Sequence, residues 1–498
     1  MRRMTVLAGA CVLLAGASLS AQQARGTTAP QGPTLQSAVA ALNATGVRSI
    51  KVTANGRLFV LGQPPTAAEP WPMRQVKEYT VQIDYGPGAM RVEQVLTMPT
   101  PAPRGGGGAI TGEQRQIQYV RGAYAWNETQ PAGGGAATFA PAPAAAADRL
   151  IWMWSATPQG ALKAAGATLA KPVADGAEIQ LTVGGRYPLH VHINKLNQVD
   201  RVRAWVPNDV FGDMLIETTY SGYRNFNGLQ FPARIQQSQG GHPTVDLTVT
   251  GVEINQYVDI SVPADVRNAA APAAPTANTE KVADGIFWIT GGSHHSLAVD
   301  MGDHVVVIEA PQNEARSDAV IAATKKLLPN KPIRMVVNTH LHFDHSGGLR
   351  RYVAEDATVV THTANTAFFE KAWAAPRTLL PDQMAKAGKK ATFQGVTDRS
   401  VLKGSNNRTI ELHVLRGNPH NEQVLVAWLP AEKILFQSDM MNPPAQGAQV
   451  PPPTPTITNF YDNLARLKIE PDQIVGGHGA RIATRADLNA VAGKAGTN

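Results

Sequence analysis

The chain has 498 residues, which is too long for one hydrophobic core, so two domains are expected. Its composition, 43% hydrophobic and 17% charged, is typical of a globular protein and excludes a fully disordered chain. The formal net charge of +7 comes from scattered Lys and Arg residues, and the absence of a basic run interleaved with aromatic residues argues against a nucleic-acid partner.

Residues 1–21 have the pattern of a secretory signal peptide. Arg2 and Arg3 precede a mostly apolar run, and small residues follow at Ser20 and Ala21, where we expect cleavage. The run is too short for a spanning helix, and no other segment has the roughly 18 consecutive apolar residues that one requires. We therefore predict an exported protein, periplasmic or secreted, with no transmembrane span.

The single cysteine, Cys11, lies inside this apolar run. Lipid modification of Cys11 is the alternative to plain export, and we disfavour it because the usual leucine before the cysteine is missing. Once the signal peptide is removed the protein has no thiol, which excludes disulfides, cysteine nucleophiles and cysteine-ligated metal.

Short segments of alternating apolar and polar residues, separated by Gly, Pro and Asn, fill residues 22–267. This pattern predicts a mainly antiparallel β domain whose strands bury one face. We expect short helices at Leu35–Leu42 and around Arg149–Ala164. Two tracts rich in Pro, Gly and Ala, Pro99–Ala109 and Pro131–Ala147, cannot bury a face, so mobile loops are expected there.

The segment YSGYRNFNGLQFPARIQQSQGG, residues 220–241, resembles a hairpin of periplasmic lipoprotein carriers, which have a curved antiparallel sheet around a helix. The resemblance implies a concave face in the first domain that binds a hydrophobic ligand or another envelope protein. A domain that only docks on its neighbour and shapes an entrance is the alternative, because sequence does not distinguish a binding face from a packed core.

A Pro- and Ala-rich linker at residues 268–280 separates this domain from residues 281–498. After the linker, near-continuous apolar strands alternate with helical stretches. This pattern predicts an α/β layered domain in which helices cover buried sheets.

The segment NTHLHFDHSGG, residues 338–348, contains four metal-ligand residues within six positions, His340, His342, Asp344 and His345. On an extended strand end, His340 and His342 point to the same side and Asp344 continues that spacing. His345 turns to a neighbouring direction where the following glycines break the strand. One short segment can therefore supply ligands to two adjacent metals.

His420 and His478 also follow predicted strands, where a rigid sheet can present ligands to one point. Imidazole and carboxylate groups suit zinc, and two zinc ions can share a hydroxide that attacks a carbonyl. Solvated loop histidines are the alternative, and the density of ligand residues argues against it.

The sequence THLHFDHSGG resembles the His-x-His-x-Asp-His motif of the metallo-β-lactamase superfamily, and the resemblance extends from about Glu280 to the C-terminus. Three later segments, GNPHNEQVLVAWLP, KILFQSDMM and VGGHG, resemble the remaining ligand segments of the family and imply His420, Asp439 and His478. The implied fold of this domain is the αββα sandwich of the superfamily.

The resemblance also implies two groups of metal ligands joined by one carboxylate. These ligands are His340, His342 and His420 for the first metal, Asp344, His345 and His478 for the second, and Asp439 between them. The set is similar to that of the glyoxalase II and lactonase branches, since true β-lactamases generally lack the bridging aspartate. His342 stands where the di-iron flavoprotein branch has a glutamate, which favours zinc, with iron as the alternative.

An exported hydrolase with two zinc ions per chain is therefore the implied function. Its bridging hydroxide would attack an ester, thioester, lactone or amide of a small-molecule substrate. Asp344 is the candidate for orienting the nucleophile and moving its proton. Two alternatives stay open: a sulfur dioxygenase of the same fold with a single iron, and a non-catalytic envelope protein that binds a ligand.

Three residues are candidates for supporting roles. Glu309 falls where the family usually has an aspartate that supports the first histidine loop, and a solvated strand end is the alternative. His294 and His295 lie on a turn that in this superfamily opens toward the rim of the site, so one of them is a candidate substrate contact, against an exposed turn pair. The loop Phe369–Thr397 and the run Pro443–Pro455 are the expected walls of the substrate pocket.

Overall fold

The computed structural model describes residues 32–131, 134–445 and 447–494. The predicted signal peptide, with Cys11, lies outside these residues. The chain from Pro33 onward forms one compact unit. Within the described ranges, no helix combines the length and the apolar character that crossing a membrane requires.

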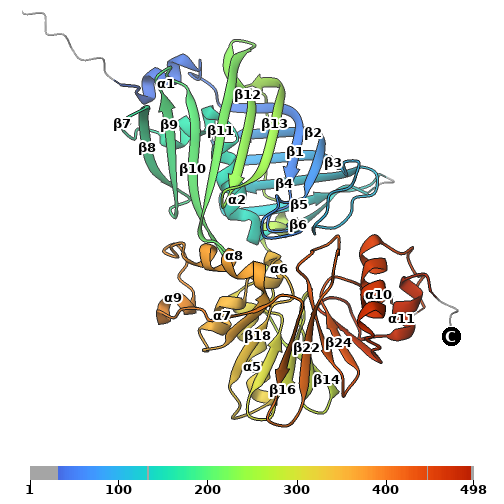
Figure 1. The fold of residues 1–498 in the computed structure, drawn as a ribbon. Helices are drawn as coiled ribbons and strands as arrows, with labels where there is room; N and C mark the ends of the chain where they lie inside the picture. The colour runs from blue at the N-terminus through green and yellow to red at the C-terminus, as the bar shows by residue number, and fades with distance from the viewer. Residues whose placement is uncertain (1–31, 132–133, 446, 495–498) are drawn as a thin grey trace, which may run out of the picture. The chain divides into compact units, whose positions relative to one another are not determined.

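A 13-stranded antiparallel sheet fills most of residues 33–267, which we call the β-rich region (Figure 1). The strand order is β6-β5-β4-β3-β2-β1-β13-β12-β11-β10-β9-β8-β7, so the first strand pairs with the last. The strands are β1 (Ser49–Phe59), β2 (Met73–Asp84), β3 (Ala89–Thr97), β4 (Gln114–Arg121), β5 (Tyr124–Thr129), β6 (Thr138–Pro141), β7 (Lys171–Val173), β8 (Gly176–Val183), β9 (Tyr187–Asn194), β10 (Val199–Asn208), β11 (Gly212–Phe226), β12 (Leu229–Gln239) and β13 (His242–Ile254).

Alternation in the sequence produces the two faces of this sheet. Along β11, every second residue from Gly212 to Tyr220 is buried, as the period of a strand requires. The buried side chains form one core with the helices α2 (Ala146–Ser155) and α3 (Pro158–Ala165). The mainly antiparallel β fold predicted for this region is confirmed.

Two helices occupy the stretch around Arg149–Ala164, where one was expected. Pro158 explains the interruption, because proline lacks the N–H that a continuing helix requires. Thr157 caps the second helix, since its side chain accepts a hydrogen bond from the Gly160 N–H. The expected helix near the N-terminus is α1 (Leu35–Ala41), and α4 (Ala264–Arg267) follows the sheet.

The C-terminal region, residues 281–494, is built mainly on two further sheets. The 7-stranded sheet contains β14 (Asn278–Ala283), β15 (Ile286–Thr290), β16 (Ser296–Asp300), β17 (Val305–Ile308), β18 (Ile333–Val337), β19 (Thr358–His362) and β20 (Phe393–Val396). The 6-stranded sheet contains β21 (Arg399–Lys403), β22 (Thr409–Val414), β23 (Leu425–Leu429), β24 (Ile434–Gln437), β25 (Gln473–Gly476) and β26 (Ala483–Thr484).

One apolar core lies between these sheets and one lies on the outer face of each, which makes an αββα sandwich. Against the first sheet lie α5 (Glu314–Leu327), α7 (Leu349–Val353), α8 (Thr363–Trp373) and α9 (Gln383–Ala387), and against the second lie α10 (Pro455–Leu467) and α11 (Arg485–Val491) (Figure 1). Strands such as β17 and β24 are buried throughout, which explains their continuous apolar sequence. The predicted layered domain is confirmed.

Parallel strands position the chemistry of this region. β17, β18 and β19 run parallel, as do β24 and β25 in the second sheet. The carboxyl ends of parallel strands lie at the same edge of a sheet, so the loops after β17 and β18 share an edge of the first sheet and those after β24 and β25 share an edge of the second. Those loops carry Glu309, the 338–345 segment, Asp439 and His478.

Candidate metal centre

The loop after β18 bends earlier than the sequence indicated. The helix α6 (Phe343–Ser346) begins directly after His342, so the chain turns at Phe343 and not at the glycines that follow. The buried Asn338 side chain holds this bend, because its Nδ2 donates to the carbonyl of His340 at 2.6 Å. His340, His342 and His345 are thereby aimed at one volume from a short stretch of chain.

All seven side chains that were predicted to bind metal come together at this edge of the sandwich. They fall into overlapping groups in which one ligand atom per residue lies within 4.8 Å of the others. The groups are His340, His342 and His420; His294, Asp344, His345 and His478; and His340, His345 and Asp439. His294, which was predicted only as a rim residue, belongs to the second group.

The Asp439 carboxylate lies between the two histidine groups. Its Oδ1 is 3.0 Å from His478 Nε2, and its Oδ2 is 2.9 Å from His345 Nε2 and 3.3 Å from His340 Nε2. One carboxylate therefore faces histidines of both groups, as a bridging ligand must.

In His342 and His478, a hydrogen bond at one ring nitrogen determines which nitrogen faces the cluster. The Pro64 carbonyl is 2.8 Å from His342 Nε2, and the Ser293 carbonyl is 2.8 Å from His478 Nδ1. A carbonyl only accepts, so these nitrogens carry the protons, and His342 Nδ1 and His478 Nε2 present lone pairs. His342 Nδ1 is buried without a hydrogen-bond partner among the described residues.

The donor set is one that can hold metal ions. His478 Nε2 lies 3.3 Å from His345 Nε2, and His420 Nε2 lies 3.4 Å from His340 Nε2. These ring nitrogens converge beside the Asp439 carboxylate, and imidazole with carboxylate is a preferred ligand combination for zinc.

The electrostatics of the cluster agree with this assignment. Burial lowers the pKa of His342 to about 3 and holds that of His340 well below its usual value, so both are neutral ligands. Burial alone would raise the pKa of Asp439, but His345 and His478 outweigh it and hold that pKa well below the ordinary range. The neutral imidazoles of His340 and His342 and the ionised carboxylate of Asp439 are in the protonation states that bind metal.

Glu309 connects two parts of the ligand loop. Its side chain is fully buried, its Oε1 accepts from the Thr339 N–H at 2.8 Å, and its Oε2 lies 2.5 Å from His345 Nδ1. Burial alone would lower the pKa of His345, but Asp439 and Glu309 raise it well above its usual value. Glu309 therefore fixes the orientation of the His345 ring, and the alternative of a solvated strand end is wrong.

The two histidines of the 293–295 turn have different environments. His294 Nε2 lies 3.3 Å from Asp344 Oδ2, and its ring centroid is 4.2 Å from that of His478. His295 points away, with Nε2 2.8 Å from the Gly479 carbonyl and its ring against Trp288. Neither matches an exposed turn pair, since His294 is 12% exposed in its side chain and His295 is buried.

Two residues of the β-rich region also contact the cluster and were missed from sequence. Gln63 Nε2 donates to Asp344 Oδ1 at 2.7 Å, and the Pro64 carbonyl accepts from His342. Neither residue type indicates metal chemistry, and both are far from the motif in the chain. The tract expected to form a mobile loop, Pro99–Ala109, is also fixed here, because the Gly105 N–H donates to the Pro419 carbonyl at 2.8 Å.

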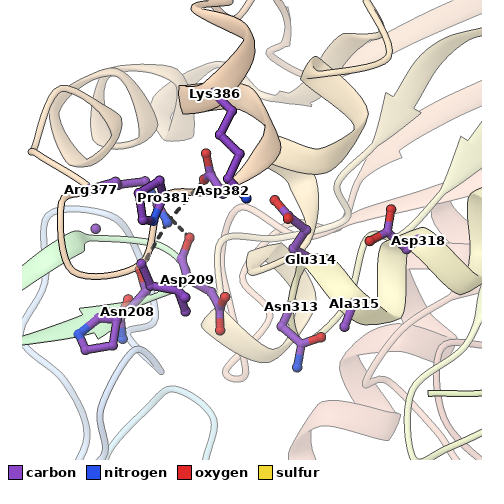
Figure 2. A pocket seen from close by; sticks show the side chains of 13 residues that line it. Asn208, Asp209, Asn313, Glu314, Ala315, Asp318, Arg377, Pro381, Asp382 and Lys386 are labelled. Carbon is purple, nitrogen blue, oxygen red and sulfur yellow. Dashed lines mark hydrogen bonds and ion pairs between the residues drawn. The ribbon is translucent and has the colours of Figure 1, made fainter. Parts of the chain in front are cut away.

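The expected pocket walls differ in their positions. Pro443 lies beside the His478 loop, since a Cβ on Gly479 would be 3.3 Å from its Cδ. The segment around Arg377 instead borders a separate cavity of about 420 Å³, which Figure 2 shows. Arg377 donates there to the carbonyl of Asp209 at 2.6 Å and lies 3.3 Å from Asp382. The described lining of this cavity includes none of the seven cluster residues, and at its wall Arg377 joins the β10–β11 turn to the C-terminal region.

A smaller cavity, of about 190 Å³, lies in the β-rich region. Its lining mixes apolar side chains such as Met90 and Trp152 with amides such as Gln94 and Gln118. Binding pockets usually measure about 300 to 1,000 Å³, so this cavity does not by itself identify an occupant. The hydrophobic ligand of this region stays a prediction.

Comparison with known proteins gives one family match. Residues 289–478 match the family model described as the metallo-beta-lactamase superfamily. Similar solved structures include metallo-β-lactamases from Pontibacter korlensis (17% identity, 45% of this chain and 100% of that chain, TM-score 0.34) and Hirschia baltica (21%, 44% and 98%, 0.33). The FIM-1 enzyme from Pseudomonas aeruginosa in its mono-zinc form is another (18%, 45% and 96%, 0.34). No curated protein matches this chain.

Proposed function

Because residues 289–478 belong to the metallo-β-lactamase superfamily, we propose that the protein is an exported hydrolase that uses two zinc ions to cleave an ester, thioester, lactone or amide. The position of Asp439 is the observation that supports two ions most directly. Its two oxygens face histidines of both ligand groups at 2.9 to 3.3 Å. A centre for a single ion does not require a carboxylate between two complete sets of ligands.

We assign the cluster residues to two sites that share one carboxylate. His340, His342 and His420 hold the first ion, Asp344, His345 and His478 hold the second, and Asp439 contacts both. A bound zinc pair supplies Lewis acidity and lowers the pKa of water, so that a nucleophile is available near neutral pH.

Asp344 is the residue best placed to handle the proton. Burial would raise the pKa of its carboxyl, but His294 and His345 hold that pKa well below the usual range, so the group is ionised. Its side chain is 39% exposed, against 19% for His478 and 16% for Asp439. Ionised and partly open to solvent, the Asp344 carboxylate is placed to orient the attacking water and to pass its proton to the leaving group.

Export is supported by the pattern of residues 1–21, and a small-molecule substrate by the family match at residues 289–478. A hydrolysis screen tests the function: esters, thioesters, lactones and β-lactams are given to zinc-loaded protein and to protein stripped with a chelator. We expect turnover of at least one class by the loaded protein, loss of that turnover after stripping, and recovery when zinc is restored. Undiminished hydrolysis by the stripped protein would refute the mechanism.

Further measurements, combined with the hydrolysis screen, distinguish the two other functions. Oxygen consumption with a persulfide substrate, together with one iron per chain, would identify a sulfur dioxygenase. Inactivity toward the whole panel, with lipid extracted from the purified protein, would identify an envelope binding protein.

His294 offers a test of how the second ligand group is oriented. We expect His294→Ala to lower kcat/KM by roughly 10- to 100-fold, because the ring contacts the Asp344 carboxylate and second-layer contacts of this kind contribute on that scale. His295→Ala is the matched control, since His295 points toward Trp288 and the Gly479 carbonyl. Steady-state kinetics of the two folded variants and the wild type measure the effect, and wild-type kinetics in His294→Ala would show that His294 has no role at the centre.

A further inference from the structure

Two loops of the β-rich region reach the metal centre. The first, residues 60–72, connects β1 to β2, and the second, residues 98–113, connects β3 to β4. Both are anchored on the C-terminal region by backbone hydrogen bonds. The first loop accepts from the Phe343 N–H at the Gly62 carbonyl (3.2 Å) and from the Glu422 N–H at the Pro65 carbonyl (2.9 Å), and in the second loop the Gly105 N–H donates to the Pro419 carbonyl at 2.8 Å. These loops therefore lie against the ligand-bearing segments on either side of His342 and His420.

The Pro64 carbonyl determines which nitrogen of His342 is available to a metal. It accepts from His342 Nε2 at 2.8 Å and from Asn421 Nδ2 at 3.1 Å. An imidazole that donates through Nε2 presents its lone pair at Nδ1, and that atom faces the cluster. The acceptor for this histidine of the C-terminal region thus comes from the β-rich region.

Because Gln63 bonds to only one oxygen of Asp344, the two carboxylate oxygens have different partners. Its Nε2 donates to Oδ1 at 2.7 Å, whereas Oδ2 lies 3.3 Å from His294 Nε2 and 3.8 Å from His345 Nε2. With Oδ1 engaged, Oδ2 is the oxygen left on the side of the second ligand group. Gln63 therefore fixes the rotation of the carboxylate that binds the second ion.

The glycine tract of the second loop packs directly on these contacts. A Cβ on Gly106 would lie 1.9 Å from Gln63 Oε1 and 2.9 Å from His342 Cε1, so only glycine fits. The Gly106 N–H donates to the Gln63 carbonyl at 3.1 Å. Arg104 adjoins this contact and pairs with Glu69 at 2.7 Å and with Glu422, one residue from each region.

The exposed fractions of the ligand side chains differ across the cluster that these two loops contact. The side chains of His340 and His342 are fully buried, whereas those of Asp344 and His478 are 39% and 19% exposed. His420 of the first group is 16% exposed, close to the value for His478, so the β-rich loops cover the His342 side of the cluster and Asp344 marks the side most open to solvent.

We propose that the β-rich region completes the metal centre. Gln63 and the Pro64 carbonyl are positioning groups for Asp344 and His342, and the loop around Gly106 closes the side of the first ion, so that substrate enters past Asp344 and His478. This inference rests on the proposed function insofar as the cluster holds zinc.

Zinc affinity tests the positioning role without relying on turnover. Metal-free full-length protein is titrated with zinc in competition with a chromophoric chelator, which resolves the two dissociation constants. We expect Gln63→Ala to weaken the second, Asp344-containing site by about tenfold, within the range known for residues that orient ligands, and to leave the first site within twofold. Gln75→Ala is the matched control, because Gln75 donates to the Gly56 carbonyl at 2.9 Å, away from the centre, and both constants should stay at wild-type values.

Two further variants separate positioning from general support of the fold. Gln63→Glu keeps the shape of the side chain but sets a carboxylate against Asp344, so it should weaken the second site more than Gln63→Ala does. Gly106→Ala should displace Gln63 and press on His342, weakening both sites, whereas Gly86→Ala, where a Cβ would lie 3.4 Å from Asp84 Oδ1, should change neither. The thermal midpoint of each metal-free variant is measured alongside.

The outcomes are distinguishable. Two zinc ions in the wild type with unchanged affinities in Gln63→Ala and Gly106→Ala would overturn this inference and leave the proposed function intact. Affinities that fall only in proportion to a lowered thermal midpoint would also overturn it, because they would show support of the fold alone. Wild-type protein that binds no zinc would overturn the proposed function and this inference together.

Discussion

Replacing Asp439 with alanine is expected to lower kcat/KM by at least about 1,000-fold, which corresponds to roughly 4 kcal/mol of transition-state stabilisation. The carboxylate lies 2.9 Å from His345 Nε2 and 3.0 Å from His478 Nε2, and no other carboxylate among the described residues faces both ligand groups. In the proposed centre this is the ligand that the two ions share, so bound zinc should fall from two ions per chain to one or none. Steady-state kinetics and metal analysis of the same preparation measure both effects.

Two control variants define what the loss of Asp439 means. Asp439→Asn keeps the volume and removes the charge, so it should resemble Asp439→Ala if charge is what the ions require. Asp472→Ala removes an exposed aspartate that is 3.9 Å from Lys433, just before β25, and should leave both kinetics and zinc content unchanged. Retention of two zinc ions and more than a tenth of the activity in Asp439→Ala would show that Asp439 is not a ligand of the centre.

Replacing Glu309 has the second-largest expected effect, and the substituting residue determines its kind. Glu309→Ala leaves the buried Thr339 N–H and His345 Nδ1 without their acceptor, at about 1 to 3 kcal/mol for each, so we expect about 2 to 6 kcal/mol of lost unfolding free energy. Glu309→Gln can still accept from Thr339, but its amide donates toward His345 Nδ1. That contact favours the tautomer with the proton on Nε2, which removes the lone pair that a metal requires.

Denaturant unfolding and zinc titration of the two variants therefore give different patterns. Glu309→Ala should lose both stability and zinc, whereas Glu309→Gln should lose affinity at the second site by about 10- to 100-fold with a smaller change in stability. Glu309→Asp retains the charge on a shorter side chain and should lie between the wild type and Glu309→Gln. Wild-type zinc affinity in Glu309→Gln would mean that the carboxylate does not set the His345 tautomer.

The fold classes and the ligand cluster were predictable because both leave local patterns in the sequence. Period-two alternation produces the faces of β11, and continuous apolar runs produce β17 and β24. His340, His342, Asp344 and His345 lie within six positions, so their short separation in the sequence keeps the four side chains close together. Asp439 and His478 follow strands of their own, and the parallel pairing of β24 with β25 places them at one edge.

The contribution of the β-rich region could not be predicted in the same way. Gln63 and Asp344 are 281 positions apart, and an amide in a proline-rich turn is ordinary loop composition. The Pro64 contact uses a backbone carbonyl, which every residue has. The tract around Gly106 was interpreted as a mobile loop because glycine-rich sequence cannot bury a face, yet here the absence of a side chain allows close approach to Gln63 and His342. These contacts depend on long-range packing, which no local pattern in the sequence encodes.

The number of zinc ions that metal-free, full-length protein binds tests the central claim most directly. Titration with metal analysis at saturation should give two equivalents per chain, with hydrolysis restored as the ions bind. Hydrolysis undiminished in protein that retains no metal would contradict the account, and so would saturation at a single equivalent with full activity.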